Sequence, residues 1–176
     1  MKELKFRTLK AEEIECRIGT LKKDSGLSLL LYKDARCDMD LLDETVGPMN
    51  WKREHSRDNA NCIVSIYDED KGEWISKEDT GSESNTEANK GLASDSFKRA
   101  CVNWGIGREL YSALFIWISK KKCNISINPK TGKAQCYDKF KVSNIHYNDS
   151  REIDGLVIVN DKNQIIYSLM PKGLKK

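Results

Sequence analysis

The 176-residue chain has little of what most catalytic and metal-binding proteins use. Its only two histidines, His55 and His146, lie in no recognisable motif and leave little choice of base for a nucleophile. Its six cysteines form no CxxC pair, so the short ligand spacing typical of a structural zinc site is absent. There is also no P-loop. We therefore predict no metal site, no cofactor and no nucleotide-driven activity.

The chain also lacks long hydrophobic runs. The longest, Leu27–Leu31 and Ala113–Ile118, are far too short to cross a bilayer. Met1–Lys10 is polar and basic and has no apolar central region of the kind found in signal peptides. With 39% hydrophobic and 32% charged residues, the composition is that of a globular protein with one sizeable core. We expect a cytoplasmic protein.

Charge is present in quantity and is unevenly distributed. The net charge of +3 conceals a segment 24–95 with 8 basic and 17 acidic residues and a segment 96–176 with 15 basic and 6 acidic residues. Such a division favours a polyanionic partner for the second half of the chain. It equally favours head-to-tail self-association, and charge alone does not separate the two.

Local patterns predict a mixed chain with many short strands. A short helix is expected over Met39–Val46, capped by Asp38 or Asp40 and ended by Gly47-Pro48. β-Branched and apolar runs between turn residues favour strands. These are expected at Leu27–Tyr32, Trp51–His55, Cys62–Tyr67, Glu73–Ile75, Leu114–Ile118, Cys136–Val142, Gly155–Val159 and Ile165–Leu169.

The most informative stretch is a predicted long helix, Thr86–Trp104. Apolar residues recur there at helical spacing, Asn85 or Thr86 can cap the start, and glycines 105 and 107 provide a stop. Lys98 and Arg99 stand beside the apolar seam. Two adjacent cations on a rigid element suit the spaced charges of a phosphodiester backbone, although on composition alone a solvated charged face is the more common explanation.

This helix resembles the signature helix of the Rad52/22 family of single-strand annealing proteins, which includes phage recombinases of the Sak type. The resemblance rests on Ala93–Ala100 (ASDSFKRA) followed by Trp104-Gly105. Met39–Trp51 is similar to the first helix of the family, Cys62–Trp74 to its hairpin, and Glu78–Glu83 to the link into the signature helix. Together these pieces cover about residues 25–118 in the family's order.

The resemblance implies a groove for single-stranded DNA. Lys98 and Arg99 match the lysine–arginine pair that lines this groove in the family, and Arg36 lies within one residue of a third groove arginine. Three further cations on the strand and turn after Trp51 could extend the basic stripe. They are Lys52, Arg53 and Arg57.

One position departs from the family pattern. Val102 stands where the family usually carries another basic residue. Arg108 or the lysines at 120–122 would have to replace that charge from elsewhere, so the path of the DNA need not follow the family's.

Two enzymatic interpretations are weaker. A magnesium-dependent nuclease would need clustered carboxylates, and the best cluster, on the first helix, lacks the usual carboxylate–x–lysine arrangement at a strand end. Its members are Asp38, Asp40, Asp43 and Glu44. Gly105-Ile106-Gly107 follows a helix instead of preceding one and lacks the third glycine of a dinucleotide-binding loop. We predict that the chain is not an enzyme.

These observations lead to one set of expectations. The fold class is α+β, an antiparallel β-hairpin sheet packed on one long helix, with a short N-terminal helix and a small C-terminal β extension. Residues 1–120 would form the DNA-binding domain and 121–176 its β-rich extension. The four tryptophans are most simply core residues.

The predicted function is ATP-independent binding of single-stranded DNA and annealing of complementary strands in recombination and repair, encoded by a phage or mobile element. The resemblance further implies a homo-oligomeric ring, and a single-strand binding protein is a possible partner. The alternative is a non-enzymatic interaction protein that docks a partner of a recombination complex and binds DNA weakly. Salt dependence separates the two, because contacts to phosphates weaken steeply as salt rises.

Overall fold

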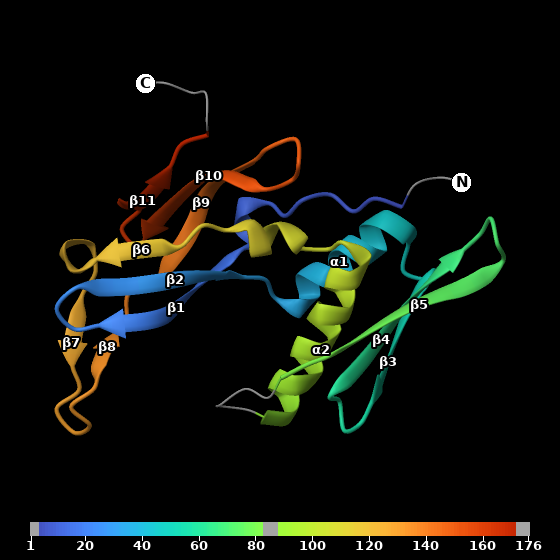
Figure 1. The fold of residues 1–176 in the computed structure, drawn as a ribbon, viewed down its shortest axis with the longest axis horizontal. Coiled ribbons are helices and arrows are strands. Elements are labelled where there is room, and N and C mark those ends of the chain that lie inside the picture. Colours follow the sequence, from blue (N-terminus) through green and yellow to red (C-terminus); the bar gives the residue numbers. More distant parts are fainter. Residues whose placement is uncertain (1–3, 83–87, 172–176) are drawn as a thin grey trace. The chain divides into compact units, whose positions relative to one another are not determined.

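The computed structural model describes residues 4–82 and 88–171 of the chain (Figure 1). The chain divides into two compact units. The first unit contains Met1–Thr8 and Asp34–Arg108, and the second contains Leu9–Lys33 and Glu109–Lys176. Each unit therefore draws on segments that are distant in the sequence.

The first unit is built from two helices and a three-stranded antiparallel sheet in the order β3-β4-β5. Its elements are α1 (Ala35–Val46), β3 (Trp51–Ser56), β4 (Asn61–Asp68), β5 (Glu73–Thr80) and α2 (Ala88–Trp104). Strands β4 and β5 contact α2, and their apolar side chains meet those of the helix in a core that includes Val64, Ile66, Phe97 and Ala100. The predicted strands over Trp51–His55 and Cys62–Tyr67 are confirmed.

Helix α1 begins earlier than its sequence pattern predicts. Asp34 is the N-cap residue, and its side chain accepts a hydrogen bond from the backbone N–H of Arg36. Asp38 and Asp40, either of which we expected to cap the helix, both lie inside it, and Asp38 is fully buried. The stop is as predicted, because Gly47 adopts a φ of 87°, a conformation that ends helices at little cost in glycine.

Helix α2 ends where the two glycines predict. Gly105 has a φ of 101°, its N–H donates to the carbonyl of Val102 at 3.0 Å, and the N–H of Ile106 donates to Cys101 at 3.2 Å. This pair of bonds is a Schellman motif, which satisfies carbonyls that the helix leaves without partners. The predicted caps Asn85 and Thr86 lie outside the described residues.

The second unit is a six-stranded antiparallel sheet in the order β11-β10-β9-β1-β2-β6. Its strands are β1 (Glu15–Lys22), β2 (Gly26–Tyr32), β6 (Ile116–Ser119), β9 (Phe140–Tyr147), β10 (Ile153–Asn160) and β11 (Ile165–Leu169). A separate two-stranded hairpin consists of β7 (Ile125–Ile127) and β8 (Ala134–Cys136). The 3₁₀ helices are η1 (Ala11–Glu13), η2 (Arg108–Ser112) and η3 (Lys120–Lys122).

The six-stranded sheet is nearly closed and barrel-like. Its two edge strands approach each other, and Lys122 from the segment after β6 donates to the carbonyl of Ile166 in β11 at 3.1 Å. Apolar side chains that alternate along the strands fill the interior, among them Leu27, Leu29, Ile118 and Ile158. The edges are thereby largely protected.

A buried carboxylate ties a loop to this unit. Glu109 is 3% exposed and accepts a hydrogen bond from the backbone N–H of Leu9 at 2.7 Å. The hydroxyl of Tyr147 donates to the carbonyl of Leu9 at 2.9 Å. Burial, followed by the nearby charge of Glu109, raises the pKa of Tyr147, which keeps its hydroxyl protonated as a donor.

The predicted fold class is wrong. The chain is mostly β, and its largest sheet is the barrel-like one, not a hairpin sheet on a long helix. Strands β9 to β11 form no appendage, because β9 pairs with β1 and extends the same sheet through β10 and β11. The sequence pattern missed this because β1–β9 pairing joins residues more than a hundred positions apart, and periodicity carries no information on such pairing.

Some boundaries also differ. The predicted strand Cys136–Val142 is two strands, with β8 ending at Cys136 and β9 beginning at Phe140. In the described part of the chain, no helix is both long and apolar enough to cross a membrane.

Candidate nucleic-acid interface

Lys98 and Arg99 both lie in the middle of α2, within the first unit. Successive residues on an α-helix point about 100° apart, so the two side chains leave the helix in different directions. Lys98 is half-buried and Arg99 is exposed. The two cations therefore have different surroundings and are best considered separately.

Arg99 joins α2 to β5. Its Nε donates to Oδ1 of Asp79 at 3.3 Å, and one turn further Asn103 donates from Nδ2 to the carbonyl of Glu78 at 2.9 Å. Lys77 completes the connection by donating from Nζ to the carbonyl of Asn103 at 2.9 Å. This face of α2 thus holds the helix on the sheet, and Arg99 contributes to that contact while remaining 47% exposed.

Lys98 and Arg36 both act on one carboxylate, that of Asp34. Arg36 forms an ion pair with Asp34, with 3.1 Å between Nε and Oδ1, and its side chain is 83% exposed. Hydrogen bonds from Arg36 lower the pKa of Asp34, and the charge of Lys98 adds to this effect. The structure therefore brings Arg36 and Lys98 together, as a groove would require.

The cations of β3 divide between the two faces of the sheet. The guanidinium of Arg53 lies 4.8 Å from the ring centroid of Phe97 in α2, on the helix-facing side. Trp51 stacks on the same ring with centroids 6.2 Å apart. Lys52 points to the other side, where its Nζ lies 5.0 Å from the ring centroid of Trp74. Arg53 therefore lies on the face of the sheet that packs against α2, the helix that carries Lys98. Lys52 lies on the opposite face.

His55 follows Arg53 on the helix-facing side of β3. Its buried Nδ1 has no hydrogen-bond partner among the described residues. Burial first, and the charge of Arg53 second, lower the pKa of His55. The imidazole is therefore neutral at pH 7 and adds no charge to this surface.

Arg57 and Arg108 are the remaining predicted cations of the first unit. Arg57 is exposed in the β3–β4 turn, with a φ of 51°. Arg108 donates from Nε to the carbonyl of Val102 at 2.8 Å and from Nη2 to that of Asn103 at 2.9 Å. Arg108 thus caps the C-terminus of α2, where cations are favourable, and places a positive charge beside position 102.

The carboxylates that accompany these cations were missed by the sequence interpretation. Asp34 could have been found from its position two residues before Arg36, at the start of a helix. Asp79 gave no such signal, because it lies 20 residues from Arg99 in the sequence. Both acids neutralise cations of the predicted groove, so its net charge is smaller than the count of basic residues indicates.

The acidic residues considered for a nuclease are used differently. Asp38 is buried within α1, and Asp43 accepts a hydrogen bond from Nε1 of Trp51 at 2.6 Å. Within residues 4–82 and 88–171, histidine, cysteine and acidic side chains form no group of three that could hold a metal ion.

Comparison with family models gives a match over part of the chain. Residues 59–128 match the model of the Rad52/22 family double-strand break repair protein. No curated protein and no solved structure matches the chain. The matched segment contains Lys98, Arg99 and Arg108 and excludes Arg36 and the basic residues of β3. It supports the family resemblance for the segment centred on α2.

Proposed function

We propose that the chain binds single-stranded DNA and anneals complementary strands without ATP, as a non-enzymatic protein of recombination and repair. The observation that carries this proposal is the family match over residues 59–128. The matched range includes Lys98 and Arg99, which lie on helix α2. Arg36 and Arg53, outside the match, supply further exposed cations on the same unit.

The proposed mechanism requires the protein only to position DNA strands and needs no catalytic group. Lys98 and Arg36 would hold phosphates of one strand and leave its base edges free to test a second strand, so that base pairing supplies the free energy. Asp34 competes with phosphate for these two cations. Because exposed ion pairs contribute about 1 kcal/mol or less, a phosphate oxygen can replace the carboxylate at small cost.

Finer features of the proposal come from the resemblance. The protein would assemble as a homo-oligomeric ring, and the opposite net charges of segments 24–95 and 96–176 are compatible with head-to-tail closure. A phage or mobile-element origin and a single-strand binding protein as partner belong to the same expectation. Residues 1–120 would carry the DNA-binding function.

The test is annealing of two complementary labelled oligonucleotides in the absence of ATP and magnesium. Wild type should accelerate annealing, and Arg36→Ala/Lys98→Ala should abolish the acceleration. This pair is preferable to one that includes Arg99, because removing Arg99 also breaks the contact between α2 and β5. Lys162→Ala, at an exposed lysine in the β10–β11 turn, is the matched control and should behave as wild type.

A partner-docking protein is the second candidate. It is favoured by ion pairs that occupy predicted cations: Arg36 with Asp34, Lys52 with Glu54 and Arg99 with Asp79. A folded, oligomeric wild type that gives no acceleration, and whose DNA affinity hardly changes with salt, would favour this candidate over annealing.

A further inference from the structure

The second unit carries a second basic surface that the proposed groove does not use. Residues 120–141 contain seven lysines and a single acidic residue, Asp138. The carboxylate of Asp138 accepts hydrogen bonds from the backbone N–H of Asn124 at 2.6 Å and from its Nδ2 at 2.9 Å. These two hydrogen bonds join the segment just before β7 to the segment just after β8, at the base of the hairpin. We call residues 120–141 the lysine-rich segment.

All seven lysines of this segment are exposed. They are Lys120, Lys121, Lys122, Lys130, Lys133, Lys139 and Lys141. Across the part of the chain that the structure describes, only Lys120 lies within ion-pair distance of a carboxylate, that of Asp24 at 3.6 Å. The positive charge of the segment is therefore largely uncompensated, unlike that of Arg36 and Arg99.

The hairpin presents two of these lysines on an ordered turn. Oδ1 of Asn128 accepts hydrogen bonds from the N–H groups of Lys130 and Thr131 at 2.9 and 3.2 Å. The N–H of Asn128 donates to the carbonyl of Lys133 at 2.9 Å, which closes the loop between β7 and β8. Gly132 adopts the positive φ of 67° that this turn requires. Lys130 and Lys133 are thus held near each other at the tip of the hairpin.

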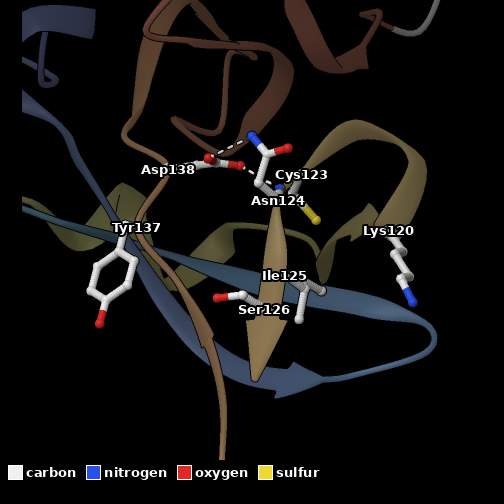
Figure 2. A pocket seen from close by; sticks show the side chains of 7 residues that line it. All are labelled: Lys120, Cys123, Asn124, Ile125, Ser126, Tyr137 and Asp138. Carbon is white, nitrogen blue, oxygen red and sulfur yellow. Dashed lines mark hydrogen bonds between the residues drawn. The ribbon is translucent and has the colours of Figure 1, made fainter. Parts of the chain in front are cut away.

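An exposed aromatic ring lies at the other end of the hairpin. Tyr137 is 78% exposed, and its hydroxyl donates to Oε1 of Gln135 at 3.0 Å, which restrains the ring. Tyr137 lines a hollow of about 340 Å³ together with other residues of the segment (Figure 2). They are Lys120, Cys123, Asn124, Ile125, Ser126 and Asp138.

We propose that the lysine-rich segment is a second contact for single-stranded nucleic acid, in which lysines bind phosphates and Tyr137 stacks on a base. Uncompensated cations and an exposed aromatic ring on one hairpin segment are the combination that sequence-independent single-strand binders use. The hollow beside Tyr137 offers Asn124 and Ser126 as polar partners for a base edge. The inference rests on the proposed function for the identity of the polyanion, but it uses none of the residues of the groove on the first unit.

The test measures the affinity of the full chain for a fluorescein-labelled oligothymidylate over a range of salt concentrations. Lys130→Gln/Lys133→Gln should reduce the slope of log affinity against log salt by about 1.4, since each phosphate contact on a single strand contributes about 0.7. Tyr137→Ala should weaken binding about tenfold at every salt concentration, the order of loss expected for one base stack. Lys162→Gln and Tyr111→Ala, at exposed residues outside the segment, should leave slope and affinity unchanged.

The outcomes separate this inference from the proposed function. If the wild type binds and Arg36→Ala/Lys98→Ala weakens binding while the segment variants equal wild type, the second contact is overturned and the proposed function stands. If the wild type does not bind the oligonucleotide, both fail. Binding to polyglutamate as tightly as to the oligonucleotide, with no effect of Tyr137→Ala, would overturn the assignment to nucleic acid in favour of an acidic protein. Thermal unfolding of each variant controls for misfolding.

Discussion

Arg99 donates a hydrogen bond from Nε to Oδ1 of Asp79 at 3.3 Å, and this bond joins the middle of α2 to the end of β5. The same arginine is a predicted DNA contact, so it is placed to serve both the fold and the groove. A substitution of Asp79 separates the two roles, because it removes the ion pair and leaves the positive charge of Arg99 in place.

Asp79→Asn should strengthen DNA binding slightly and lower stability, whereas Arg99→Ala should weaken both. The neutral amide no longer competes with phosphate for Arg99. The loss of the ion pair should cost about 1 kcal/mol or less, because both side chains are partly exposed. Fluorescence anisotropy with labelled oligonucleotide and urea unfolding measure the two effects. Equal losses of stability in both variants, with unchanged DNA affinity in each, would assign Arg99 to the fold alone.

Asp34→Asn should make stability less dependent on pH. Hydrogen bonds from Arg36 and the charge of Lys98 lower the pKa of Asp34 in the folded protein. A carboxyl with a lowered pKa contributes stability above its unfolded pKa of about 3.9, and this contribution is lost as pH falls through the lower folded pKa. Asparagine still caps α1, so the capping hydrogen bond is retained. In urea unfolding, the free energy of unfolding of wild type should exceed that of the variant at pH 7, and this difference should disappear below about pH 4. A difference in unfolding free energy that stays constant with pH would contradict a stabilising role for the charge of Asp34.

Gly81→Ala should destabilise the first unit. A Cβ at position 81 would lie 2.6 Å from the backbone N of Ser96 and 2.9 Å from the carbonyl oxygen of Leu92, both in α2. Because these are backbone atoms, the helix itself would have to shift, at a cost of about 1–3 kcal/mol. Urea unfolding measures the loss. Gly132→Ala is an informative comparison, since no atom lies within 4 Å of a Cβ there and only the positive φ of 67° opposes it. A larger loss for Gly132→Ala than for Gly81→Ala would contradict the close approach.

Cys62 should resist alkylation in the folded protein. It is fully buried in β4, and burial raises the pKa of its thiol from 9.0 to about 11, although the charge of Arg53 opposes part of this rise. At pH 8 its thiolate fraction is then about a hundredfold below that of an unperturbed thiol. Iodoacetamide labelling followed by peptide mass spectrometry should show slow reaction in the native state and rapid reaction in urea. Rapid native labelling of Cys62 would mean that the sheet opens locally.

The elements around α2 could be predicted because their signals are local. The β-branched run over Cys62–Tyr67 predicts β4, and Gly105 predicts the end of α2, since each depends on residues within a few positions. The start of α1 was misplaced because three aspartates near it can cap a helix. Packing selects Asp34 as the cap and buries Asp38.

The candidate site was predictable only in its basic residues. A sequence shows where Lys98, Arg99 and Arg36 stand, and a family resemblance indicates their use. It does not show that Asp79 reaches Arg99 from β5, or that the charges of Arg36 and Lys98 both act on Asp34. Such pairs depend on how elements pack, and they decide how much of the charge is available to phosphate.

The sequence by itself determined the helices' ends at Gly47 and Gly105, strand β4, the start of β5, and the concentration of lysine after residue 119, because each is a property of neighbouring residues. Only the tertiary structure decided that β1 and β2 share one barrel-like sheet with β6, β9, β10 and β11. Strand pairing buries side chains from distant segments together, and its free energy depends on the assembled core, which no local pattern encodes.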